Sequence, residues 1–170
     1  MMLLVNGIVM LALVTVAAED KKEASTDGKD FVAKAFCCNE TEIKLGKLAA
    51  DKAENSEVKA FAEMMVRDHT KAQEELKKVC KEAKLECPTE QTKEGKECCD
   101  KLEKTEKGKE FDKAYMQTQI KLHDKAVKTL EQASKEGPEA VREFAKKMLP
   151  TVQDHQKKAK EIASKIGAES

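Results

Sequence analysis

The sequence predicts an all-α protein, a four-helix bundle with a long connection between its second and third helices. Of its 170 residues 38% are charged, and Lys, Glu and Ala, which favour helices, are abundant. Apolar residues recur at alternating steps of four and three along four long stretches, which places them on one buried line of a helix. A single polar group interrupts each line.

The first two helices are expected to form a hairpin. The spacing predicts one helix over about 30–53 and another over about 56–84, with Asn55 and Ser56 as turn and N-cap residues between them. Pro88 ends the second helix, because proline cannot supply the next helical hydrogen bond.

The chain then needs a long connection before the third helix. Residues 89–108 are charged and carry two glycines, so they are expected to contain one short helix. The third helix is predicted over about 110–134. Gly137 and Pro138 form a stop and start signal, since glycine suits the position past one helix and proline the first turn of the next. The fourth helix continues to about Lys165.

The polar interruptions lie near the middle of each helix. The four lines run along Phe31, Ala35, Cys38, Glu42, Leu45 and Ala49; Val58, Ala62, Met65, His69, Ala72, Leu76, Val79 and Ala83; Met116, Ile120, His123, Val127 and Leu130; and Val141, Ala145, Met148, Val152, His155, Ala159, Ile162 and Ile166. From the rise of about 1.5 Å per residue, Glu42 and His69 should be level, whereas His155 should lie about one turn from His123.

Three imidazoles and one carboxylate that converge near the middle of the bundle suggest a metal site. Neutral imidazole suits Zn, Cu and Fe, so the sequence predicts a single transition-metal ion. Methionines on the same lines make copper the preferred ion, although core filling is the favoured interpretation of these side chains. Carboxylates adjacent to the histidines point about 100° away and are expected to be outer hydrogen-bond partners. The candidate ligands are Glu42, His69, His123 and His155, and the candidate outer partners are Asp68, Asp124 and Asp154.

The polar ring has two other interpretations. Unpaired buried polar groups cost about 1 to 3 kcal/mol each, so the ring is alternatively a metal-free hydrogen-bond network, for example with a Glu42–His69 pair. A di-iron oxidase needs Glu-x-x-His on two helices. Val66, Ile120 and Val152 stand where those glutamates would be, which disfavours that chemistry. No catalytic residue is assigned, and a non-enzymatic role is favoured.

The first 18 residues carry no charged side chain and are predicted to be a secretory signal peptide. Their apolar run is shorter than the roughly twenty residues that span a bilayer, so no stable membrane insertion is expected after cleavage. A flexible lead-in over 19–29 and a bundle domain over 30–166 follow, and the expected location is the periplasm or cell envelope. Lys plus Arg equals Asp plus Glu at 32 each, which argues against a nucleic-acid partner.

Six cysteines suit an oxidising compartment. Cys80 and Cys87 flank the end of the second helix and are expected to bond to each other. Cys37 and Cys38 are expected to find partners in the adjacent cysteines 98 and 99, although the sequence does not fix the connectivity. A cysteine metal cluster ranks lower, because the usual Cys-x-x-Cys spacing is missing.

Four motifs together resemble a known family. They are Glu-Ile-Lys-Leu-Gly-Lys-Leu-Ala over 42–49, Val-Lys-Ala-Phe-Ala-Glu-Met-Met-Val-Arg-Asp-His over 58–69, Phe-Asp-Lys-Ala-Tyr over 111–115 with His123, and Phe-Ala and Leu-Pro before His155. The chain resembles, over about 29–162, a ferritin-like family of exported bacterial proteins catalogued as domain of unknown function 4142. The resemblance implies a ferritin-like bundle in the periplasm or envelope and brings no established activity. The two adjacent cysteine pairs depart from the family's pattern.

Two functional hypotheses follow. The first is an exported ferritin-like four-helix bundle protein that binds one transition-metal ion through its buried His/Glu cluster. The second is a non-catalytic structural or stress-related envelope protein whose buried ring is an architectural hydrogen-bond network.

Overall fold

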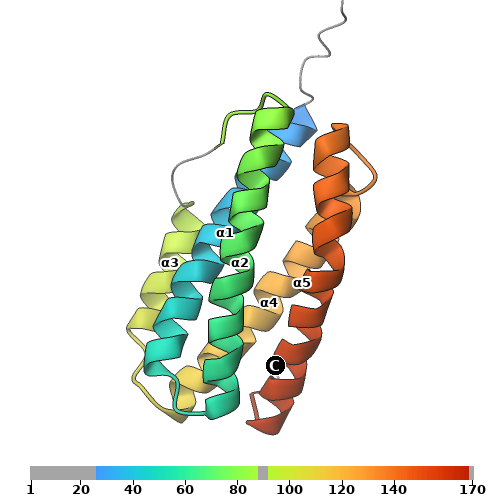
Figure 1. Cartoon of the computed structure of the whole chain (residues 1–170). Helices are drawn as coiled ribbons and strands as arrows, with labels where there is room; N and C mark the ends of the chain where they lie inside the picture. The colour runs from blue at the N-terminus through green and yellow to red at the C-terminus, as the bar shows by residue number, and fades with distance from the viewer. Residues whose placement is uncertain (1–25, 88–91, 169–170) are drawn as a thin grey trace, which may run out of the picture.

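The computed structural model describes residues 26–87 and 92–168, and all the regular structure in these ranges is helical (Figure 1). Four helices are long and one is short. The predicted helix ends agree with the structure to within four residues, and the short helix in the connection is confirmed. The helices are α1 (Thr26–Lys52), α2 (Ser56–Glu82), α3 (Lys93–Glu103), α4 (Lys109–Ala133) and α5 (Glu139–Lys165).

The predicted signal peptide over 1–18 lies outside the described residues, as does most of the lead-in. Helix α1 begins at Thr26, inside the stretch expected to be a flexible lead-in. No helix of the described ranges combines the length and the apolar character needed to cross a bilayer.

The bundle consists of two helical hairpins, α1 with α2 and α4 with α5, which meet mainly through α2 and α5. Helix α3 runs back beside α1, so α4 starts at the same end of the bundle as the α1–α2 turn and lies parallel to α2 (Figure 1). The long connection between α2 and α4 is therefore a crossover. The Lys52 ammonium ties α1 to the end of α3 by donating to the carbonyl oxygens of Glu103 at 2.6 Å and Thr105 at 2.8 Å.

A buried carboxylate holds the α1–α2 turn. Asp112, in the first turn of α4, accepts hydrogen bonds from the backbone N–H groups of Glu54 at 3.1 Å and Asn55 at 2.8 Å. The Asn55 side chain in turn caps α2, as predicted, by accepting from the backbone N–H of Glu57 at 2.8 Å. These contacts satisfy amides that a helix end leaves without partners, and they fix α4 against the first hairpin.

Two apolar clusters fill the bundle, one toward each end. One is built around Leu45, Met65, Phe111 and Met116, and the other around Phe31, Leu76, Phe144 and other apolar side chains of the opposite end. Apart from Asp112, the buried polar residues of the four long helices lie between these clusters in sequence, including Glu42, His69, His123 and His155. The core therefore consists of two apolar parts separated by a polar layer.

The cysteine prediction is confirmed in one part and wrong in another. Cys80 and Cys87 form a disulfide at the end of α2. Cys38 and Cys98 are thiols, so two bridges between α1 and α3 do not form. Cys38 is also exposed, although it was placed on the buried line of α1. The reason is that adjacent helical residues point about 100° apart, so both members of a pair cannot face one partner helix.

Candidate metal centre

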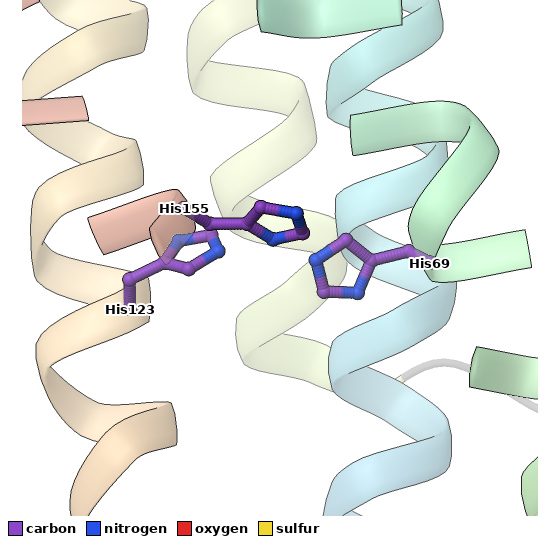
Figure 2. Close-up of side chains that lie close together, drawn as sticks. All are labelled: His69, His123 and His155. Atoms are coloured by element: carbon purple, nitrogen blue, oxygen red, sulfur yellow. The ribbon is translucent and has the colours of Figure 1, made fainter. Parts of the chain in front are cut away.

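Three histidines from three helices meet in the polar layer. His69 comes from α2, His123 from α4 and His155 from α5, and Figure 2 shows their rings converging on one point. The ring centroids are 5.9 Å apart for His69 and His123, and 5.6 Å apart for each pair that includes His155. One ring nitrogen of each histidine lies within 4.8 Å of those of the other two. All three side chains are buried.

The expected offset of His155 does not separate it from the other two. His123 lies ten residues before the end of α4, and His155 lies sixteen residues after the start of the antiparallel α5. Helical side chains lean toward the N-terminus of their own helix. In antiparallel helices the two side chains therefore lean in opposite directions, and these two rings lean toward each other. The opposite lean of the two side chains therefore closes the offset that the backbone rise predicts, and the rings converge as expected.

Each histidine is held by an acceptor at its outer nitrogen. His69 Nδ1 donates to Asn39 Oδ1 at 2.9 Å, and His123 Nδ1 donates to the carbonyl oxygen of Gln119 at 2.9 Å. His155 Nε2 donates to the Asp68 carboxylate at 3.2 Å. Because a carbonyl or carboxylate oxygen only accepts, each of these nitrogens carries the proton of its ring.

The three remaining ring nitrogens consequently carry no proton, and each presents a lone pair. His69 Nε2, His123 Nε2 and His155 Nδ1 are buried and find no hydrogen-bond partner among the described residues. Lone pairs cannot bond to one another, so the arrangement lacks a group that would accept their electrons. An outer partner that fixes tautomer and ring orientation is the usual support of a metal-binding histidine.

The electrostatic surroundings keep two of these rings neutral. Burial, together with the nearby His123 and His155 rings, holds the pKa of His69 well below its usual range. Burial and His123 also lower the pKa of His155, while the Asp68 carboxylate opposes that shift. Neutral imidazole is the form that binds a metal, so both rings are poised as ligands near neutral pH.

Glu42 lies beside His123, on the side of Nδ1. Its Oε1 is 3.6 Å from His123 Nδ1, and its Oε2 accepts a hydrogen bond from Gln119 Nε2 at 2.7 Å. Burial raises the pKa of Glu42, against the opposing effects of His123 and Gln119. Among the described residues, the group whose ligand atoms lie within 4.8 Å of one another comprises the three histidines, without Glu42.

Of the three carboxylates expected to support the histidines, one does so in the structure. Asp68 on α2 bonds to His155 on α5, a different helix, as predicted. Asp124 instead receives hydrogen bonds from Gln156 and Lys160. Asp154 pairs with Lys158 on its own helix at 2.6 Å. Asp124 and Asp154 are more exposed than Asp68, and they pair with nearby lysine and glutamine side chains instead of a histidine.

Sequence reasoning missed two residues of the site. Asn39 and Gln119 are buried and hydrogen-bonded to the cluster, yet neither lies on the predicted apolar lines. A signal was present, because Asn39 precedes Glu42 by three residues and Gln119 precedes His123 by four. Such spacings place both residues on the same helix face as the predicted ligand.

The fold and the site together define a helical-bundle protein with a buried cluster of three histidines. The chain belongs to the family described as "Domain of unknown function (DUF4142)", whose model matches residues 14–162. The resemblance drawn from the motifs is confirmed by this match. No curated protein matches the chain.

Two solved structures share the fold at low identity. One is described as "Crystal structure of DUF305 fragment from Deinococcus radiodurans", with a TM-score of 0.73, 10% identity, and coverage of 84% of this chain and 98% of that chain. The other is described as "Crystal structure of putative secreted protein DUF305 from Streptomyces coelicolor", with a TM-score of 0.71, 12% identity, and coverage of 85% and 96%. At these identities the similarity concerns the fold alone.

Proposed function

We propose that the protein binds one transition-metal ion through His69 Nε2, His123 Nε2 and His155 Nδ1. The observation that carries this proposal is the convergence of three buried ring nitrogens that lack partners among the described residues. Each ring is anchored at its other nitrogen, as in histidine metal sites. A cation at their centre would satisfy all three lone pairs at once.

The architectural network fits this geometry less well. In a metal-free network each of these three nitrogens would need a hydrogen-bond donor, and a buried polar atom without a partner costs about 1 to 3 kcal/mol. The predicted Glu42–His69 pair is not among the contacts of the site, since Glu42 bonds to Gln119 and approaches His123. None of the described residues supplies a donor to these three nitrogens.

The donor set supports a single ion of Zn, Cu or Fe, all of which accept neutral imidazole. Glu42 was predicted as a fourth ligand, and we assign it instead the outer role of orienting His123 and balancing the charge of the ion. Met65 and Met116 belong to one of the apolar clusters, which favours core filling for these two side chains over thioether ligation.

We further propose that the four long helices form a ferritin-like four-helix bundle and that the protein acts in the periplasm or cell envelope. The crossover between α2 and α4 supports the first point. The Cys80–Cys87 disulfide, the apolar start of the sequence and the description of one structural neighbour as secreted support the second. The role is the storage, buffering or transport of the ion, without catalysis.

The test is the metal content of protein purified without chelators, measured for Zn, Cu and Fe by elemental analysis. We expect about one ion per chain, and its loss from a variant with His69, His123 and His155 all changed to Ala. Thermal unfolding of both proteins verifies that the variant is folded. Equal and negligible metal in the two samples, before and after incubation with each ion, would contradict the proposal in favour of the architectural network.

A further inference from the structure

A cavity of about 490 Å³ adjoins the three histidines. Residues of all four long helices and of the start of α3 line it, and His69, His123 and His155 form part of its wall. Small-molecule sites in proteins have volumes of roughly 300 to 1,000 Å³ and are mostly apolar with a few polar groups. The cavity fits this description.

The sequence explains why the space exists. Ala35 on α1 and Ala126 on α4 line the cavity with short side chains, where larger residues would fill the gap between these helices. The rest of the apolar wall includes Phe31, Leu130 and Phe144, all buried. An apolar body in this space would remove their surface from water, which is favourable in proportion to the area covered.

The rim carries charge of both signs. Lys34 and Lys125 are exposed lysines on the cavity wall. Of the acidic groups on the wall, Asp68 is bonded to His155, Glu42 is held by Gln119, and Glu94 is exposed. An ion held by the three imidazoles would add positive charge to this wall.

We propose that this cavity binds a small carboxylic acid with an apolar body, whose carboxylate becomes the remaining ligand of the ion held by His69, His123 and His155. This inference rests on the metal site proposed above. Three protein ligands leave a tetrahedral ion with one open position, which an exogenous ligand takes. The lysines at the rim would draw the anion in, and the walls would hold its apolar body.

The experiment uses the full-length protein loaded with Co²⁺, whose visible absorption reports changes in its ligands. Acetate, octanoate and 1-octanol are titrated separately. We expect octanoate to change the Co²⁺ spectrum with an apparent Kd at least tenfold lower than that of acetate. The reason is that only octanoate combines the carboxylate with an apolar body. We expect 1-octanol, which lacks the carboxylate, to leave the spectrum unchanged.

Two variants test the position of the bound acid. Ala126→Phe on α4 and Ala35→Leu on α1 narrow the cavity. Each should raise the apparent Kd for octanoate at least tenfold. Co²⁺ binding and the response to acetate should be unchanged. Ala60→Phe, at an exposed position of α2, is the matched control and should change none of these values. Thermal unfolding identifies the folded variants.

The possible failures are distinguishable. If Co²⁺ binds with dependence on the three histidines but octanoate binds no more tightly than acetate, or is insensitive to both cavity variants, the acid site is wrong and the metal site stands. A spectral response to 1-octanol equal to that of octanoate would overturn the carboxylate assignment. If Co²⁺ does not bind, the metal site fails and the acid site with it.

Discussion

The Asp68 carboxylate on α2 accepts a hydrogen bond from Nε2 of His155 on α5 at 3.2 Å. This contact crosses the interface through which the two helical hairpins meet, and it leaves Nδ1 of His155 directed to the other two histidines. Removal of such an outer partner typically lowers metal affinity 10- to 100-fold.

We therefore expect Asp68→Asn to weaken metal binding by roughly that factor, because an amide also offers a donor and no longer fixes the tautomer of His155. Competition with a chromophoric chelator measures the change. Asp154→Asn is the control, since Asp154 adjoins His155 in the sequence but pairs with Lys158. Equal affinities for the two variants would exclude Asp68 from a supporting role.

Glu42→Gln distinguishes an outer partner from a ligand. The new amide oxygen can still accept the hydrogen bond from Gln119, so the variant should fold. If Glu42 only orients His123, the stoichiometry should remain about one ion per chain, with affinity lowered by about tenfold to a hundredfold. Complete loss of metal from a folded variant, by elemental analysis, would instead make Glu42 a direct ligand.

The metal-free protein should lose stability as the pH falls below about 6.5. The pKa values of His69 and His155 are lower in the folded state than the usual value of 6.5, so below that value the unfolded chain binds protons that the folded chain does not. The contribution of these two histidines to the free energy of unfolding is thus complete above about pH 6.5 and is lost below it. We expect the free energy of unfolding to fall by about 1 to 2.5 kcal/mol between about pH 7 and about pH 5.5. Urea unfolding at both pH values measures the loss.

Glu42 acts in the opposite direction, since its raised pKa favours the folded state as the pH falls. Glu42→Gln removes that compensation, and its metal-free form should show a steeper loss toward acid. Stability that stays constant or rises from about pH 7 to about pH 5.5 in the metal-free Glu42→Gln variant, where this compensation is absent, would contradict the burial of neutral histidines.

Asp112→Ala should destabilise the fold without altering the metal site. The substitution removes the acceptor of two backbone hydrogen bonds at the α1–α2 turn, and hydrogen bonds to charged groups contribute about 1.5 to 3 kcal/mol each. We expect a loss of about 2 to 5 kcal/mol in urea unfolding. The exposed Glu110→Ala, in the same helical turn, should cost far less, and metal stoichiometry should be unchanged in both variants.

Local patterns in the sequence determined most of the fold. Steps of four and three residues identified the buried side of α2 correctly from Val58 to Val79, because that helix packs along a single line. The same method failed at Cys38, since α1 also packs beside α3 and borders a cavity, which a single line does not describe. Asn55 and Pro138 marked their turns because capping and proline geometry act over only a few residues.

The candidate ligands could also be predicted, because a polar residue on an apolar line is visible in one dimension. The tertiary structure alone decided how they are used. His155 contacts the other histidines because side chains on antiparallel helices lean in opposite directions. Glu42 lies at the outer nitrogen of His123. Asp68, and neither Asp124 nor Asp154, is the carboxylate that accepts a hydrogen bond from a histidine of the cluster. Tautomers and contacts between helices depend on positions far apart in the chain, which local spacing does not encode.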